Sequence, residues 1–365
     1  MIEIKNNTFV EISLSNLMHN FKLIKDKYPS HDILVSVKAD AYGHGMKEIV
    51  NYLSQFSDGF LVATYKEAME LRRESDVRII CLQGPSSKFQ AMQMASYNIA
   101  MVIHCHNQFR HIIEENLDLK ELDLWIKFDS GMGRLGLDHE TTLRAFEVLS
   151  PYAKKLTLMS HFSSTSSENF SEEFSKLQIK RFKSILNEIK QNGFSVKTSL
   201  SNSGGAINLY PDTFDIIRLG ISVYGSSSSG SLKGDEFLNV MTLKSKIISL
   251  KEIGPGDSVG YDNKWVAKRK TKVAHLEIEY ADGLSRRLSN NGKVLINGVY
   301  AKIIGNISMD LTAVDVTDIP NVKYLDEAIF WGGDLNIDLV ARLADRIPYE
   351  LMTSISDRVE RVYIK

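Results

Sequence analysis

Short apolar runs of the strand type alternate with helical stretches along the first two thirds of the chain. The first helical stretch, at residues 15–27, carries Leu17, Phe21 and Ile24 at spacings of three and four residues, with Ser15 as its expected N-terminal cap. Strands that alternate with helices form parallel βαβ units, and eight units over about 220 residues fit a (β/α)8 TIM-like barrel better than an open doubly wound sheet. The eight predicted strands are residues 32–37, 59–63, 77–82, 98–103, 122–128, 156–160, 195–200 and 215–218.

The pattern changes after a polar stretch, GSSSSGS, at residues 225–231. A flexible stretch directly after the eighth unit is where a domain boundary is expected, so we predict a barrel over residues 1–230 and a second domain over residues 231–365. In the second domain, Asn297-Gly298 separates two apolar runs, which is typical of a hairpin with a type I′ turn. The predicted strands make this domain mostly β, and they are residues 241–250, 272–278, 294–296, 299–304, 311–316 and 328–331.

Charge and cysteine usage limit the classes of partner. Lys and Arg total 44 and Asp and Glu total 45, so no basic field attracts nucleic acid or an anionic membrane surface. No apolar run reaches about 18 residues, and the first residues lack a signal-peptide pattern. The two cysteines, Cys81 and Cys105, argue against a disulfide framework. We therefore predict a cytoplasmic protein that acts on a small molecule.

Polar side chains stand at the ends of five predicted barrel strands. The loops after the strands of such a barrel converge around its carboxyl-end mouth and form the active site there, so these side chains are expected to meet. They are Lys38 after the first strand, Lys127, Asp129 and Arg134 at the fifth, His161 after the sixth, Asn202 and Ser203 after the seventh, and Arg218 at the eighth, where the backbone of Gly220 follows. By contrast, the segment from His104 to His106 lacks the ligand spacing of a zinc site, and we expect no metal.

Lys38 and the last two strand ends indicate a particular chemistry. Lys38 follows a strand of the buried type, and partial desolvation lowers the pKa of an amine and makes it a nucleophile, as a Schiff base requires. The loops after strands seven and eight commonly hold a phosphate in barrels, and here they offer the Ser203 hydroxyl and the backbone N–H groups of Gly204, Gly220 and Ile221. A Schiff-base lysine beside a phosphate cradle suggests pyridoxal 5'-phosphate (PLP).

The same residues carry a resemblance to a known family. The segment VKADAYGHG around Lys38 resembles the PLP-lysine motif of alanine racemases. The chain also resembles further sequence blocks of that family, in the same order: FDSGMGRLG, MSHF, SNSGG, RLGISVYG, VGYDN, YADGLSRR and NISMDLTAVDVTD. Such an ordered set, which covers essentially the whole chain, is far more specific than one short match. The resemblance implies a PLP-dependent, homodimeric alanine racemase that supplies D-alanine for peptidoglycan.

Through this resemblance, two residues are implied as the catalytic bases. Lys38 would hold PLP and, once released by substrate, act as one base. Tyr261, in VGYDN, matches the second base, which reaches the active site of the partner subunit in a head-to-tail dimer. Two bases on opposite faces are the simplest way to remove a proton from one face of a carbon and return one to the other.

The resemblance also implies the cofactor and substrate contacts. Arg218 matches an arginine that faces the pyridine nitrogen; because arginine keeps its proton, it donates to that nitrogen without protonating it and weakens the ring as an electron sink. The remaining matches are Tyr42, Ser203, Gly220 and Ile221 at the phosphate, His161 stacked on the ring, Arg134 at the phenolic oxygen and the substrate, Met309 at the substrate carboxylate, and Lys127 as a possible carbamate.

Three residues depart from the family pattern and leave alternatives open. Asp357 stands where many members have tyrosine, Glu279 where glycine is usual, and Asn306 where arginine is frequent. The substrate therefore stays open between alanine, serine and a broader range. A PLP-dependent decarboxylase would place a carboxylate, and not Arg218, against the pyridine nitrogen. A non-catalytic PLP carrier would resemble the barrel alone, without Tyr261 and the second domain.

Overall fold

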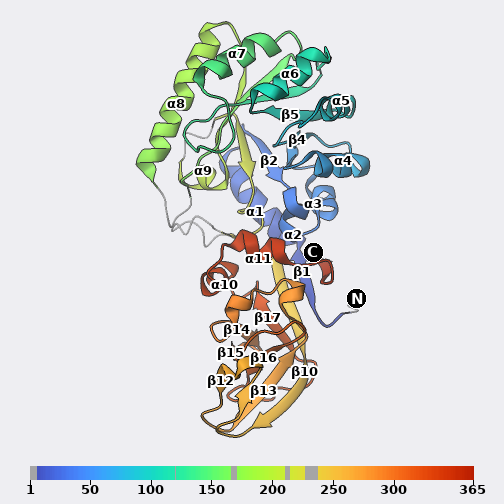
Figure 1. The fold of residues 1–365 in the computed structure, drawn as a ribbon, viewed down its shortest axis with the longest axis vertical. Coiled ribbons are helices and arrows are strands. Elements are labelled where there is room, and N and C mark those ends of the chain that lie inside the picture. Colours follow the sequence, from blue (N-terminus) through green and yellow to red (C-terminus); the bar gives the residue numbers. More distant parts are fainter. Residues whose placement is uncertain (1–5, 120, 166–170, 210–213, 227–236) are drawn as a thin grey trace.

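The computed structural model describes residues 6–119, 121–165, 171–209, 214–226 and 237–365. Two eight-stranded sheets organise the chain, one parallel and one mostly antiparallel. The molecule is elongated, with the parallel sheet and its helices at one end and the second sheet at the other (Figure 1). Among the described residues, no helix combines the length and the apolar character needed to cross a membrane.

The parallel sheet is the predicted barrel. Its strand order is β8-β7-β6-β5-β4-β3-β2-β9, and the backbone bond from Arg218 N to Ser201 O, 3.0 Å long, connects the segments of β9 and β8. All eight predicted strands are present, each within two residues of its predicted ends. They are β2 (Asp32–Ser36), β3 (Gly59–Val62), β4 (Ile79–Cys81), β5 (Ile99–Ile103), β6 (Asp123–Lys127), β7 (Lys155–Met159), β8 (Lys197–Ser199) and β9 (Ile216–Leu219).

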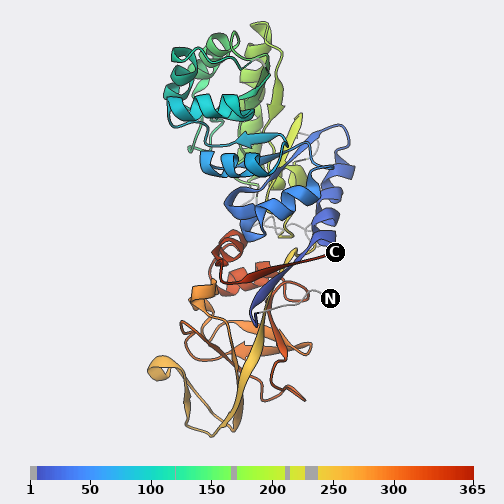
Figure 2. The same cartoon turned by 90° about the vertical axis from the view of Figure 1, so that its right-hand side faces the viewer.

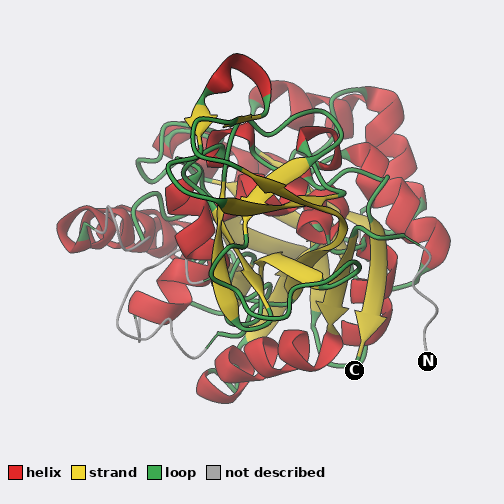
Figure 3. Ribbon diagram, turned by 90° about the horizontal axis from the view of Figure 1, so that it is seen from below, coloured by secondary structure: helices red, strands yellow, loops and turns green. Residues whose placement is uncertain are grey.

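Alternate residues of these strands fill the barrel and cover its outside. Leu34, Leu61 and Trp125 pack in an inner cluster, whereas Ile33 and Val35 belong to the larger core that includes the surrounding helices. Seen along the long axis, the strands lie centrally with helices around them (Figure 3). These helices are α1 (Leu14–Lys27), α2 (Lys38–Gly43), α3 (Met46–Leu53), α4 (Tyr65–Glu74), α5 (Lys88–Ser96), α6 (His106–Glu114), α7 (His139–Leu149), α8 (Glu172–Gln191) and α9 (Ser203–Asn208).

The predicted N-terminal cap of the first helix is wrong by two residues. Ser13, and not Ser15, has the extended backbone of a cap, and its Oγ accepts the N–H of Asn16 at 3.2 Å. The helix starts at Leu14 because the preceding residues form a strand, β1 (Phe9–Ser13), that ends at the cap. A serine at either position fits the capping preference, so the sequence alone did not separate them.

The second sheet includes a strand from the start of the chain. Its order is β13-β16-β15-β14-β17-β10-β1-β18, so β1 lies between β10 (Met241–Ile253) and β18 (Glu360–Ile364). β1 is antiparallel to β10 and parallel to β18. Residues 9–13, which the predicted boundaries assign to the barrel, therefore pair within the second sheet. The predicted boundary at residue 230 lies outside the described residues, as does most of the GSSSSGS stretch, and it stays a prediction.

The rest of the second domain matches the predicted mostly β pattern. Asn297 and Gly298 have φ of 50° and 77°, which is the backbone of the predicted type I′ hairpin turn. The other elements are β11 (Ser258–Val259), β12 (Trp265–Val266), β13 (Thr271–Leu276), β14 (Lys293–Ile296), β15 (Val299–Ile303), β16 (Thr312–Asp315), β17 (Glu327–Trp331), α10 (Ile337–Leu343), α11 (Pro348–Ser354) and the 3-10 turns η2 (Tyr261–Asn263), η3 (Tyr280–Asp282) and η4 (Arg286–Leu288).

The barrel and the second domain meet where α11 packs against α2 (Figure 1). The C-terminus lies at this junction, as a view turned by 90° also shows (Figure 2). A Cβ atom added to Gly43 at the end of α2 would come within 2.3 Å of the carbonyl oxygen of Met352. The two domains therefore touch directly beside the loop that carries Lys38.

Candidate active site

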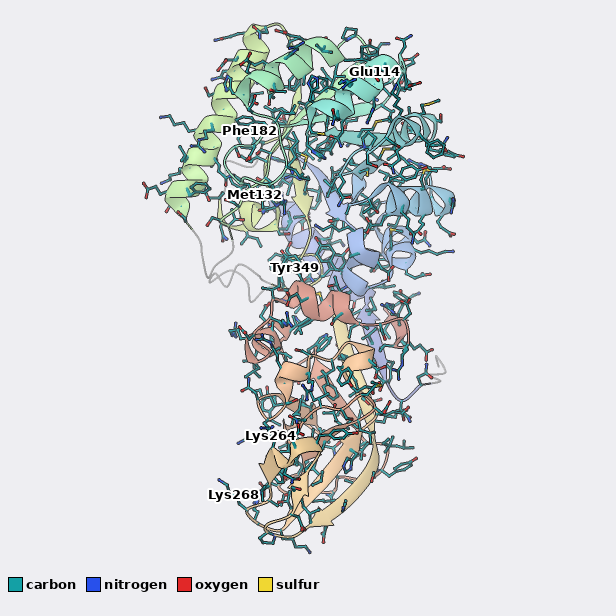
Figure 4. The ribbon with its side chains drawn as sticks, in the orientation of Figure 1. Glu114, Met132, Phe182, Lys264, Lys268 and Tyr349 are labelled. Carbon is teal, nitrogen blue, oxygen red and sulfur yellow. The ribbon has the colours of Figure 1, made fainter. Side chains whose placement is uncertain are left out.

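A cavity of about 750 Å³ lies between the barrel mouth and the helices α10 and α11. Tyr349, one of its lining residues, lies at the junction of the two domains (Figure 4). Most barrel residues that the sequence predicted for a site are brought together here: Lys38, Tyr42, Lys127, Arg134, His161, Asn202, Ser203, Arg218, Gly220 and Ile221 all line the cavity. Asp129 does not line it; its Oδ1 accepts the backbone N–H groups of Gly131 and Met132, both at 2.9 Å. Another cavity, of about 700 Å³, lies outside the barrel between α4 and α5 and contains none of them.

Lys38 begins an unusual turn at this mouth. The four residues that follow it, Ala39 to Tyr42, all have left-handed backbone, with φ between 52° and 55°. For residues with a Cβ atom this conformation costs about 1–2 kcal/mol each, so it persists only where the surroundings impose it. Burial lowers the pKa of Lys38, and the nearby positive charge of Arg134 lowers it further. A larger share of the amine is therefore unprotonated at neutral pH than in an exposed lysine.

Hydroxyl and backbone N–H groups form one side of the cavity. The Oγ of Ser203 accepts the N–H of Gly220 and the hydroxyl of Ser222, both at 2.9 Å. A Cβ atom on Gly220 would come within 2.7 Å of the Tyr42 hydroxyl, so a side chain at this position would occupy the space between them. Donors that converge around a glycine backbone are the usual protein partners of a phosphate.

Arg218 is fixed by groups of the neighbouring strand ends. Its Nη2 donates to the carbonyl oxygens of Ser160 at 2.7 Å and Leu200 at 3.3 Å and lies 3.1 Å from His161 Nδ1, while Nη1 donates to the Ser199 hydroxyl. Burial lowers the pKa of Arg218 to about 9 and, with the charge of Arg218, holds the pKa of His161 well below its usual range. At neutral pH the guanidinium is charged and the imidazole is neutral.

The cavity carries an excess of positive charge. Lys127 is 6% exposed, and burial together with Arg134 and Arg218 lowers its pKa to about 8. Among the described residues that line the cavity, Asp338 is the only acidic one. Several cations in a partly enclosed space attract anionic groups, so this charge distribution suits a phosphate or a carboxylate.

Two residues that the sequence assigned to the site lie elsewhere in the chain. Tyr261 is 70% exposed and Met309 is 56% exposed, and neither lines the cavity. Lys264, the residue after η2, lies well away from Tyr349 along the long axis (Figure 4). The Asn306 side chain donates to the carbonyl oxygen of Tyr261 at 3.2 Å, which joins the turn of Tyr261 to the segment of Met309. Within one chain, therefore, these two residues do not meet Lys38.

The three residues that depart from the family pattern do not line the cavity. Glu279 is buried, its Oε1 lies 3.0 Å from Nη2 of Arg358, and the same guanidinium lies 3.4 Å from Asp282. Burial and the Asp282 carboxyl raise the pKa of Glu279 to about 7. Asp357 is exposed and does not line the cavity.

Sequence reasoning missed the cavity wall that comes from the second domain. Arg342, Arg346 and Tyr349 line the cavity, although they lie more than 120 residues after the last barrel strand. Arg342 lies in the last turn of α10 and Arg346 in the connection to α11, and nothing in the sequence around them indicates which part of the barrel they meet. Ser222, the partner of Ser203, was also missed, because serine is common in loops of every kind.

Models of known protein families match both domains of the chain. The family model described as "Alanine racemase, N-terminal domain" matches residues 12–228, and "Alanine racemase, C-terminal domain" matches residues 240–363. The alanine racemase of Vibrio vulnificus (strain CMCP6) is 36% identical over 359 residues, which cover 96% of this chain and 98% of the relative. The biosynthetic alanine racemase of Pseudomonas aeruginosa is 34% identical over the same coverage of 96% and 98%.

Solved structures give the same result. The crystal structure of biosynthetic alanine racemase from Pseudomonas aeruginosa has a TM-score of 0.92 at 32% identity and covers 99% of this chain and 100% of its own. Alanine racemase from Bartonella henselae with covalently bound pyridoxal phosphate has a TM-score of 0.89 at 28% identity, with coverage of 98% and 99%.

Proposed function

The chain belongs to the alanine racemase family, and we propose that it interconverts L-alanine and D-alanine with PLP held covalently by Lys38. The observation that carries this proposal is the position of Lys38, an amine of lowered pKa, in one cavity with Arg218 and a phosphate-type cradle. We further propose that the product is used for peptidoglycan.

The residues of the cavity fit the cofactor. Ser203, Tyr42 and the N–H groups of Gly220 and Ile221 are donors suited to its phosphate, and the space beside Gly220 is open only because no side chain stands there. The excess of positive charge offsets the anionic groups of PLP. When bound, PLP withdraws electrons from the substrate α-carbon and makes its C–H bond acidic. The neutral ring of His161 offers an uncharged face for stacking.

Two bases on opposite faces move the proton. Lys38 serves as one base because its lowered pKa leaves the Nζ lone pair available. We assign the other to Tyr261 of a second copy of the chain, since Tyr261 is 70% exposed and does not line the cavity of its own chain. The working unit is then a head-to-tail homodimer, in which the second domain of each subunit completes the cavity of the other. Met309, three residues after the Asn306 that bonds to Tyr261, would contact the substrate carboxylate.

Arg218 supports racemisation over decarboxylation. Four contacts with Ser160, His161, Leu200 and Ser199 hold its guanidinium, which stays protonated at neutral pH and can only donate. A decarboxylase profits from a carboxylate at this position, because a protonated ring is the stronger electron sink. We also assign Arg134 to the phenolic oxygen of PLP and to substrate, and a carbamate on Lys127 would hold Arg134 in place.

Reduction of the purified protein by borohydride tests the assignment of Lys38. The reagent makes the link between PLP and its lysine permanent, and peptide mapping should find the adduct on Lys38. Lys38→Ala should lose racemisation, whereas Lys47→Ala, a substitution of the exposed lysine of α3, should keep it. An adduct on another lysine, or none, would overturn the proposal.

Racemisation and α-deuterium exchange across L-amino acids test the substrate. Alanine should react fastest. A higher kcat/KM with serine would replace alanine in the proposal and leave the mechanism in place. Release of CO2 without racemisation would favour the decarboxylase.

A further inference from the structure

The left-handed turn after Lys38 is held from two sides, by the barrel and by the C-terminal strand β18. A run of non-glycine residues with positive φ is kept only where contacts outside the run impose it. The contacts that hold this turn therefore also decide where Lys38 stands at the cavity.

On the barrel side, Glu67 of α4 and His44, which follows the turn in the chain, hold the turn. The N–H of Ala39 donates to Oε1 of Glu67 at 2.8 Å. The ring Nδ1 of His44 lies 3.0 Å from the carbonyl oxygens of both Ala41 and Tyr42. His44 is fully buried, and its ring centre lies 4.6 Å from that of Tyr224. Burial lowers the pKa of His44 to about 4. The ring is therefore neutral at pH 7 and adds no positive charge near Lys38.

The C-terminal strand holds the end of the turn. Nε of Arg361 donates to the carbonyl oxygen of Gly43 at 2.9 Å and lies 3.8 Å from the Asp40 carboxylate. The Tyr363 hydroxyl donates to the carbonyl oxygen of His44 at 3.0 Å. The Arg361 side chain is only 15% exposed, so its bond to Gly43 is shielded from competing water. Two residues from the end of β18 thus bind consecutive carbonyls at the end of the turn.

We propose that Arg361, assisted by Tyr363, is a positioning residue for Lys38: it fixes the left-handed turn and thereby keeps the Lys38 amine at the cavity. The position of Arg361 is set by the second domain, because β18 pairs with β1 and Arg361 stands opposite Val10 in that sheet. The position of the Lys38 amine at the cavity therefore depends on a sheet that lies outside the barrel. This inference rests on the proposed function, in which Lys38 captures PLP.

Capture of PLP by the cofactor-free protein tests the inference without any need for racemisation. The rate at which PLP forms a borohydride-reducible adduct on Lys38 is measured from pH 7 to 10. Arg361→Met removes the contacts with Gly43 and Asp40 and keeps most of the side-chain stem. It also removes the bonds from the same guanidinium to the carbonyl oxygens of Val359 and Ile355, both at 3.3 Å. Arg72→Met is the matched control, because Arg72 is similarly buried, at 11% exposed, and donates to the backbone carbonyls of Ser75 and Asn98, both at 3.1 Å.

We expect Arg361→Met to capture PLP about tenfold more slowly at pH 8, since a small displacement of a reacting group has effects of at least this size. The pH of half-maximal capture should also rise. Burial and the charge of Arg134 lower the pKa of Lys38, and a displaced, more hydrated amine loses part of both effects. The carboxylate of Glu67, which raises this pKa, stays in place. Arg361→Lys should recover most of the rate by donating to the Gly43 carbonyl. The Arg72→Met control should capture PLP at the wild-type rate.

Unchanged capture and pH dependence in Arg361→Met, with a loss of melting temperature like that of Arg72→Met, would overturn the inference and make Arg361 purely structural. If Arg361→Met does not fold, Tyr363→Phe replaces it. This variant loses only the hydroxyl bond to His44, and it should slow capture by a smaller factor; a wild-type rate and pH profile would overturn the inference. Absence of capture by the wild-type protein would instead overturn the proposed function.

Discussion

Replacing Lys127 with methionine should stabilise the cofactor-free protein near neutral pH. The pKa of Lys127 is about 8 in the fold against 10.5 for an ordinary lysine, because the side chain is buried close to Arg134 and Arg218. At about 1.4 kcal/mol per pKa unit, keeping this ammonium in the fold costs up to about 3 kcal/mol of unfolding free energy. The cost is complete below pH 8 and disappears as the pH rises from 8 towards 10.5, since the folded chain then releases the proton before the unfolded chain does. Methionine keeps the apolar stem without the charge.

Melting temperatures of both proteins, measured without CO2 from pH 6.5 to 9.5 at one protein concentration, test this reasoning. The Lys127→Met variant should melt above the wild type at pH 7, and the gap should shrink above pH 8. Lys155→Met, at the exposed start of β7, is the control and should give an offset that does not change with pH. A Lys127→Met protein that melts below the wild type, with a gap independent of pH, would refute the argument.

Bicarbonate then distinguishes a carbamate from a free amine on Lys127. Carbamylation joins the neutral amine to CO2 with release of a proton, and it places an anion where a cation was repelled by Arg134. Bicarbonate at pH 8 should therefore raise the melting temperature of the wild type and leave that of Lys127→Met unchanged. No change in the wild type would mean that Lys127 stays an amine.

Three further changes test the cradle, the shared site and the buried acid. Gly220→Ala should raise the dissociation constant of PLP at least about tenfold, because the alanine Cβ would stand 2.7 Å from the Tyr42 hydroxyl. Equilibrium dialysis measures this constant, and an unchanged value would remove this phosphate cradle from the proposal. A mixture of Lys38→Ala and Tyr261→Phe chains should regain about a quarter of wild-type racemase activity, since half of randomly formed dimers are mixed and each has one intact site of two; no recovery after proven subunit exchange would contradict the shared site. The melting temperature of Glu279→Gln should rise relative to that of the wild type as the pH increases from 5 to 8. The pKa of Glu279 is raised from 4.5 to about 7, so ionisation of this buried acid destabilises the wild-type fold above pH 4.5. A difference in melting temperature that does not change with pH would show that Glu279 does not titrate in this range.

The barrel could be predicted because its strands are buried on both faces. Continuous apolar runs such as Ile33 to Val35 give a strong signal, and the alternation with helices limits the topology. β1 could not be predicted in the same way. Its five residues are too few to set a period, and its partners are Met241 to Lys244 and Glu360 to Ile364, far along the chain. Local sequence carries no information on pairing at that separation.

The site could be predicted where barrel geometry alone brings residues together. Lys38 and Arg218 stand at strand ends, so their meeting follows from the closed sheet. The conformation of the turn after Lys38 was out of reach, because the sequence Ala-Asp-Ala-Tyr has no glycine to indicate left-handed backbone. That conformation is imposed by tertiary contacts, among them the one from Arg361. The position of Tyr349 depends likewise on how the two domains meet.

The pairing of β1 has a consequence for how the chain is made. Ser13 leaves the ribosome early, but its partner Ile364 on β18 is added at the far end of the chain. At about 5–20 residues per second, translation of the stretch between them takes roughly 20–70 s. During this interval the edge of β1 that pairs with β18 has no neighbouring strand, and such an edge is a template for aggregation. The folding yield of the newly made protein should therefore rise when nascent chains are dilute, or when a chaperone covers β1 until β18 is complete.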